Sequence, residues 1–129
     1  MKETYDFLKS CGVFYIATID NDKPRVRPFG AVNIFEDKLY LQTGKIKNVF
    51  KQIELNNHVE ICGFSEGKWI RIETELVVDD RDEAKIDMLE HNPELKAMYS
   101  VDDNNKVLYM KNAKATIYSF TEAPIVMEF

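Results

Sequence analysis

Short runs of β-branched and aromatic residues, each ending at a cluster of turn-forming residues, recur along most of this chain and restrict its possible folds. The first run covers residues 13–19 and stops at the turn-forming residues 20–23. Because the side chains of a strand point alternately to its two faces, such runs predict short strands with one buried face. The remaining predicted strands cover 25–35, 39–43, 59–64, 69–78, 107–110 and 113–120.

Two of these runs predict more than a strand. In the run 69–78, alternate apolar residues predict one core face, formed by Ile70, Ile72, Leu76 and Val78. In the run 25–35, Pro28 cannot donate to a strand ladder and Gly30 has no side chain to pack. This pair predicts an edge strand, a bulge or the close approach of a ligand.

Helical periodicity is confined to short segments. A helix over 45–55 is predicted because apolar residues recur at i, i+3, i+4 and i+7, namely Ile46, Val49, Phe50 and Ile53. A second helix is predicted over 80–90, and Pro93 after Asn92 predicts a further helical turn toward Met98. About six antiparallel strands with so few helices favour a mainly β fold, a small closed or partly open barrel, in one domain spanning 1–129.

Several classes of protein are excluded at this stage. No apolar run approaches the roughly 18 residues of a membrane span, and residues 1–10 are charged and contain no signal-peptide core. We therefore expect a cytoplasmic protein that does not bind membranes. Cys11 and Cys62 lie among apolar neighbours, which predicts buried, reduced thiols. His58 and His91 are isolated, and no CxxC or HExxH spacing occurs, so no metal site is predicted.

Charge is distributed unevenly along the sequence. The whole chain has a formal net charge of -5, yet residues 23–53 carry +5 and the remainder carries -10. A basic segment in an acidic protein is expected where one small anionic ligand binds while nucleic acids and anionic membranes are repelled. A solvated face with scattered lysines would give the same count.

The basic segment joins a predicted strand, at 24–30, to the start of the predicted helix, at 42–48. A helix start offers unpaired N–H groups and a partial positive charge. With Lys47 and Asn48 in the first turn and Thr43 just before it, this start would hold a phosphate group well. An arginine on the strand can add a bidentate contact.

The same residues also allow a purely structural interpretation. In that case Thr43 only caps the helix, the lysines are solvated, and Arg27 pairs with Glu36 or Asp37. Basic residues at a helix start oppose the helix dipole, however, and are better explained if an anion binds there.

A family resemblance rests on short runs in a fixed order and spacing: 25–30 (Arg-Val-Arg-Pro-Phe-Gly), 41–43 (Leu-Gln-Thr), 47–53, 56–62 and 69–72. In this order they resemble the pyridoxamine 5'-phosphate oxidase-like proteins, a family of flavin-binding split β-barrels. Residues 92–99 and 115–120 are similar to the short, stand-alone bacterial members. The resemblance covers nearly the whole chain. It implies a six-stranded antiparallel split β-barrel of the Greek-key type, with FMN as the cofactor.

The resemblance also implies which residues hold the cofactor. The FMN phosphate would be bound by Arg25, Arg27, Thr43, Lys47 and Asn48. The isoalloxazine ring would lie along Pro28, Phe29 and Gly30, with Gln42 near its polar edge.

Two further positions, Trp69 and Arg71, match a place that often reaches the flavin across a homodimer interface. The alternative is a core or interface tryptophan, and a strand-face arginine paired with Glu73 or Glu75. The homodimer itself is implied by the resemblance, with some support from the apolar tail at 125–129.

The resemblance therefore implies a homodimeric FMN flavoprotein that acts as an oxidoreductase on a small molecule, with NAD(P)H as a candidate electron donor. The chain ends at 123–129 without the arginine-rich, tryptophan-containing segment of the full-length oxidases, so oxidation of pyridoxamine phosphate itself is not expected. No residue pattern indicates covalent catalysis, and no catalytic residue is assigned.

Two alternatives stay open. One is a barrel that binds or stores a flavin, deazaflavin or haem without turnover, with His58, His91 or Cys62 as the haem ligand. The other is an oligonucleotide-binding barrel, which the acidic remainder of the chain disfavours.

Overall fold

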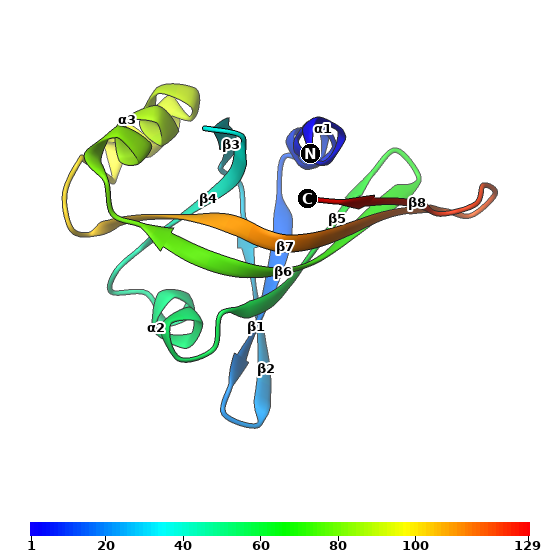
Figure 1. Ribbon diagram of the computed structural model, residues 1–129, viewed down its shortest axis with the longest axis horizontal. Helices are drawn as coiled ribbons and strands as arrows, with labels where there is room; N and C mark the ends of the chain where they lie inside the picture. The colour runs from blue at the N-terminus through cyan, green and yellow to red at the C-terminus, as the bar shows by residue number, and fades with distance from the viewer.

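Eight strands form one antiparallel sheet in the computed structural model, which describes residues 1–129 (Figure 1). The strand order is β2-β1-β5-β6-β7-β4-β3, and β8 pairs with β7 outside this path. The elements are α1 (Lys2–Cys11), β1 (Phe14–Asp20), β2 (Lys23–Phe29), β3 (Val32–Phe35), β4 (Lys38–Gly44), α2 (Asn48–Leu55), β5 (His58–Ser65), β6 (Lys68–Asp79), α3 (Asp82–His91), the 3-10 helix η1 (Pro93–Ala97), β7 (Asn105–Ser119) and β8 (Ile125–Glu128).

The segment predicted as one strand over 25–35 is two strands, β2 and β3, separated by Gly30 and Ala31. These two strands lie at opposite ends of the strand order. The chain passes from one edge of the sheet to the other within two residues, so the sheet has to curl back on itself. No ladder joins β2 to β3, and the sheet therefore stays open. The mainly β, antiparallel fold is confirmed, but the structure has eight strands instead of six and no closed barrel.

Two long strands, β6 and β7, form the spine of the sheet. The strands predicted separately over 107–110 and 113–120 are one strand, β7. The interruption between them is a β-bulge, because the β6–β7 register shifts between Glu73 and Glu75, and Asn112 has a left-handed backbone with φ of 52°. Asparagine tolerates this conformation better than most residues. The apolar tail forms β8 and pairs with β7 within the chain.

The inward faces of the strands and the helices enclose the main hydrophobic core. The alternation predicted for 69–78 is confirmed for Ile70, Ile72 and Leu76, which are fully buried, whereas Val78 is only partly buried. Helix α2 buries Val49, Phe50 and Ile53 as predicted, but it begins at Asn48 and not at residue 45. None of the helices has the length and apolar content that a membrane span requires.

Helix α1 and both cysteines differ from expectation. Helix α1 was not predicted, although Tyr5 and Leu8 lie three residues apart on one face and pack on the core. Both cysteines are free thiols, but the prediction that both are buried is wrong: Cys62 is exposed and Cys11 is only partly buried. The neighbours of Cys62 on β5, Ile61 and Gly63, face the core, so the alternation of the strand turns Cys62 outward.

A second cluster of interactions ties the β3–β4 hairpin to β6 and α3. The buried Tyr40 hydroxyl donates to Asp79 Oδ2 at 2.7 Å. Arg81 donates to the same carboxylate at 2.9 Å and pairs with Glu36 at 2.9 Å. Hydrogen bonds from Arg81, and to a lesser degree from Tyr40, lower the pKa of Asp79 to about 2. Asp79 is therefore a buried carboxylate kept charged by its partners.

We predict that Asp79→Asn lowers the free energy of unfolding by about 1 to 3 kcal/mol at pH 7, because the charge-assisted bonds to Asp79 are lost. Folding depresses the pKa of Asp79, so its contribution is complete above about pH 4 and fades as the pH falls toward 2. Urea unfolding of the two proteins at pH 7 and at about pH 2 measures the loss of unfolding free energy, which should be smaller at the lower pH. Glu83→Gln is the control, because Glu83 lies 3.9 Å from Arg81 and is exposed. Equal losses in the two variants would contradict the prediction.

Candidate functional site

Arg27 is the best-positioned cation of the basic segment. Its guanidinium donates from Nη1 to Thr18 Oγ1 at 2.7 Å and from Nη2 to Gln52 Oε1 at 2.7 Å. A longer bond of 3.3 Å from Nη1 reaches the backbone carbonyl of Ile16. Three elements, β1, β2 and α2, therefore fix the orientation of one side chain.

The charge of Arg27 has no carboxylate partner. Glu36 pairs with Arg81, and Asp37 makes no ion pair, so the alternative in which either acid neutralises Arg27 is not observed. Burial, and to a lesser extent the nearby charge of Arg25, lowers the pKa of Arg27. An arginine stays charged in a protein, so this side chain presents an uncompensated positive charge.

The start of α2 lies beside Arg27. Lys47 is the N-cap residue, with extended backbone angles, and Asn48 is the first helical residue. The prediction that Lys47 lies in the first turn is therefore wrong. No side chain caps the helix; Thr43 is buried in β4 and does not cap it either. Neither Lys47 nor Lys51 makes a salt bridge. The first N–H groups of α2 and two free lysines are therefore open to an anion.

Two adjoining hollows follow β2. The first, of about 890 Å³, lies between β2 and α2, and its lining includes Arg25, Arg27, Pro28, Lys47 and Asn48. The second, of about 420 Å³, shares Arg27, Pro28 and Lys47 with the first and adds Phe29, Gly30, Gln42 and Thr43. Because the two hollows share residues, we treat them as one trough. The trough brings together eight of the ten predicted cofactor-binding residues, together with Gly30.

The far wall of the second hollow was not predicted. It is formed by η1 and the residues after it: Glu94, Leu95, Met98 and Tyr99. Tyr99 packs so closely on β4 that a Cβ at Gly44 would lie 2.9 Å from the Tyr99 hydroxyl. Gln42 is buried, and its amide nitrogen donates to Asn105 Oδ1 at 3.1 Å. Nothing in the sequence links residues 94–99 to the basic segment, because the contact depends on the curl of the sheet.

The two residues that orient Arg27 were also missed. Thr18 donates to Gln52 Oε1, so the same amide oxygen accepts from both Thr18 and Arg27. The predicted helix did place Gln52 one turn after Asn48 on the same face. No signal in the sequence indicates that Thr18 of β1 faces that helix.

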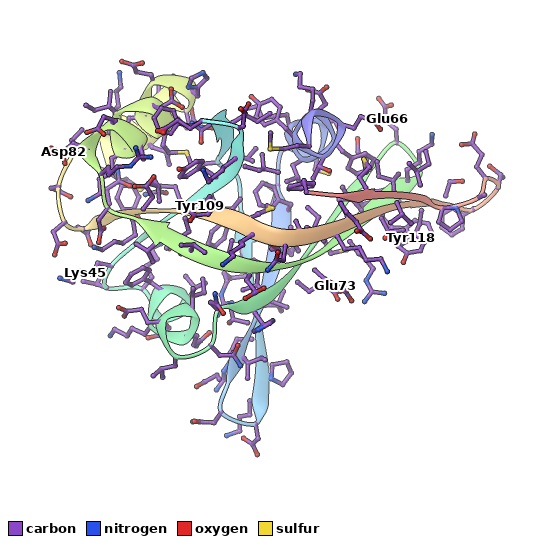
Figure 2. The ribbon with its side chains drawn as sticks, viewed as in Figure 1. Lys45, Glu66, Glu73, Asp82, Tyr109 and Tyr118 are labelled. Atoms are coloured by element: carbon purple, nitrogen blue, oxygen red, sulfur yellow. The ribbon has the colours of Figure 1, made fainter.

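Trp69 and Arg71 lie outside the trough, on the outer face of β6. The Trp69 ring stacks on Tyr118, with centroids 5.5 Å apart and an interplanar angle of 14°. Figure 2 shows Tyr118 close to β8, at the opposite end of the molecule from α2. Arg71 pairs with Glu60 at 2.7 Å and not with a glutamate of residues 73–75. Within one chain, neither residue can reach the trough.

The residues considered as haem ligands do not meet the trough. His58, His91 and Cys62 are absent from the lining of both hollows. His91 lies at the end of α3, where its Nδ1 is 2.9 Å from the carbonyl of Asp87. No group of three or more His, Cys, Asp or Glu side chains could hold a metal ion.

An open, curled antiparallel sheet with a cationic trough beside one edge strand defines a small β-protein with a candidate site for an anionic small molecule. A family model described as pyridoxamine 5'-phosphate oxidase matches residues 1–114. The chain therefore belongs to this family, and the resemblance found in the sequence is confirmed. No curated protein matches the sequence.

Solved structures agree with this assignment. A NimC/NimA family protein from Clostridium acetobutylicum is 47% identical, with a TM-score of 0.97, over 100% of this chain and 92% of that one. General Stress Protein 26 from Bacillus anthracis str. Sterne is 19% identical, with a TM-score of 0.73, over 98% of both chains. A heme binding protein from Mycobacterium smegmatis is 10% identical, with a TM-score of 0.78, over 98% of this chain and 56% of that one. The last two show a shared fold only.

Proposed function

We propose that this protein binds FMN in the trough and works as an oxidoreductase on a small molecule. The observation that carries the proposal is Arg27, whose guanidinium is held by uncharged oxygen atoms beside an uncapped helix start. A phosphate dianion supplies the negative charge that this arrangement lacks.

The phosphate would lie where the two hollows meet. Its ligands come from β2, β4 and the start of α2, and they are Arg25, Arg27, Thr43, Lys47 and Asn48. The Thr43 hydroxyl makes no hydrogen bond within the chain and lines the second hollow, so it is available to a ligand. This donor set suits a phosphate monoester, because it combines bidentate, point-charge and neutral donors.

The second hollow fits the ring of the cofactor. Its volume of about 420 Å³ lies within the roughly 300–1,000 Å³ of small-molecule sites. Pro28, Phe29 and Gly30 form one side, and the missing side chain of Gly30 leaves room for a flat group. When bound there, a flavin supplies the redox chemistry. The chain's own part is to orient the ring and to exclude water from it with the apolar side chains of Leu95 and Met98.

Haem is a weaker candidate for this trough. No histidine or cysteine lines either hollow, so Met98 and Tyr99 are the residues there of the types that commonly ligate haem iron. The positive charge of the trough instead suits a phosphorylated ligand. We therefore favour a flavin nucleotide.

We further propose that two copies of the chain associate through the outer face of β1, β5 and β6. Tyr15 and Phe64 are 50% and 60% exposed on this face, and Trp69 pairs with Phe64 across the β5–β6 ladder. Tyr15 also pairs with Pro28, which lines the trough, so the face is continuous with the site. Exposed aromatic side chains of this kind mark an interaction surface, and the Arg71–Glu60 ion pair lies on the same face. A second copy would bring its own Trp69 and Arg71 to this surface.

The first prediction from this proposal concerns cofactor affinity. Arg27→Ala should weaken FMN binding at least tenfold, because a charge-assisted hydrogen bond contributes about 1.5 to 3 kcal/mol. Lys114→Ala is the control and should change the affinity less than twofold, since Lys114 is exposed and outside the trough. Quenching of flavin fluorescence measures both. A colourless purified protein that leaves FMN fluorescence unchanged at micromolar concentrations would refute flavin binding, and equal losses would place the site elsewhere.

The second prediction concerns turnover. NADH or NADPH should reduce the FMN-loaded protein under anaerobic conditions, seen as loss of the flavin absorbance, and a nitro compound should restore it. The trough is open along β2, so a second ligand can approach the ring. A yellow protein that neither nucleotide reduces would favour a storage or carrier role.

The third prediction concerns assembly. Light scattering should give twice the chain mass of 15.0 kDa. The double substitution Tyr15→Asp and Phe64→Asp should give a monomer, because each new charge would have to be buried in the interface. Ile86→Asp, at a residue 43% exposed on α3, should leave the dimer intact. A parent protein that is monomeric at micromolar concentrations would rule out the interface.

A further inference from the structure

Helix α2 carries two stripes of side chains, and only one of them belongs to the core. Val49, Phe50 and Ile53 form the buried stripe. The second stripe follows the spacing i, i+3, i+4 and i+7 and lines the first hollow; its members are Asn48, Lys51, Gln52 and Leu55. A helical stripe that faces a hollow is placed to contact a ligand along the length of the helix.

The first hollow is larger than a flavin phosphate requires. At about 890 Å³, it could hold a drug-sized ligand by itself, since such sites measure roughly 300–1,000 Å³. The phosphate of FMN would occupy only the end near Arg27, where the two hollows meet. The part that extends toward Lys51 and Leu55 would remain free.

The free part is rich in unsatisfied donors. Lys51 makes no salt bridge, and the side-chain amide nitrogen of Gln52 has no partner, because only the oxygen of this amide bonds to Arg27 and Thr18. Arg25, on the opposite wall, is held by Asp20 at 2.9 Å and remains half exposed. The first hollow contains four cationic side chains and a single carboxylate. A phosphate monoester carries two negative charges at most, so one phosphate does not neutralise the hollow.

Apolar side chains flank these donors. Leu55 is 90% exposed at the end of α2, and Val26 is 68% exposed on β2. Both line the first hollow. Exposed apolar residues next to cations match a ligand that has a flat base beside its phosphates, which is a nucleotide.

We propose that the outer part of the first hollow is a second phosphate subsite, which takes the ADP part of a dinucleotide. Lys51 and the amide nitrogen of Gln52 would contact the phosphates, and Leu55 would contact the base. This inference rests on the proposed function, because the flavin phosphate occupies the inner end. The ADP part could belong to a flavin dinucleotide bound in place of FMN, or to a nicotinamide dinucleotide bound beside FMN.

The test uses ADP as the probe, titrated into the FMN-loaded protein by calorimetry. Lys51→Glu should weaken ADP binding at least tenfold and FMN binding less than threefold, and Lys9→Glu, the same charge change on α1, should weaken neither. Leu55→Ala should weaken ADP binding but not the binding of inorganic pyrophosphate, because only ADP has a base. All three side chains are exposed, so the variants should fold.

Two further measurements distinguish a flavin dinucleotide from a nicotinamide dinucleotide as the ligand that carries the ADP part. A flavin dinucleotide is indicated if FAD binds the cofactor-free protein more tightly than FMN and loses this advantage in Lys51→Glu. A nicotinamide dinucleotide is indicated if FAD gains nothing and ADP competes with reduction by NADH or NADPH.

Three results would overturn the subsite: no ADP binding at millimolar concentrations, ADP binding that Lys51→Glu leaves unchanged, or displacement of FMN by ADP. If FMN itself does not bind, the proposed function fails. The same ADP titration of the cofactor-free parent and Lys51→Glu proteins then decides the subsite independently.

Discussion

The geometry of this protein depends on one covalent constraint, the two-residue connection through Gly30 and Ala31. It joins strands at opposite edges of the sheet, β2 and β3, so an extended flat sheet is impossible. The curl that results brings the free edge of β2 next to β4 and the start of α2. The second hollow lies at this seam, because its lining combines residues 27–31 with Gln42 and Thr43. The site is thus a consequence of how the sheet is connected and not of a separate loop.

In the structure, the cations of the trough differ from many other cations of the chain in forming fewer ion pairs with carboxylates. Several cations outside the trough are neutralised, among them Arg71 by Glu60, and Arg81 by Glu36 and Asp79. Even Lys45, a member of the basic segment, pairs with Asp103. Inside the trough, Arg25 pairs with Asp20, whereas Arg27, Lys47 and Lys51 have no carboxylate partner. A solvated face with scattered lysines does not explain this contrast, because Arg27 is partly buried and held by three elements.

Local sequence patterns predicted the elements but not how they meet. The periodicity of α2 and the alternation of β6 follow from which face is buried, and both were predicted to within a few residues. Gly30 was predicted to mark an edge strand, a bulge or a ligand contact, but the local sequence does not reveal that the chain crosses there from one edge of the sheet to the other. The contact of Arg27 with Thr18 and Gln52, and the wall formed by η1, depend on the curl of the whole sheet. Helix α1 was missed although Tyr5 and Leu8 pack on the core at helical spacing, because its charged residues were read only as evidence against a signal peptide.

The alternation of β2 connects the trough to the outer face of the sheet. Arg27 and Phe29 pair with Ile16 and Phe14 and share their inward face, whereas Pro28 pairs with Tyr15 and lies on the outer face. A partner that covered Tyr15, on β1, would lie next to Pro28 on β2, the strand that carries Arg27. β2 is an edge strand with a ladder on one side only, so fewer backbone hydrogen bonds hold it in place than hold a central strand. We therefore expect the proposed association at the outer face to be coupled, through β2, to the proposed binding in the trough.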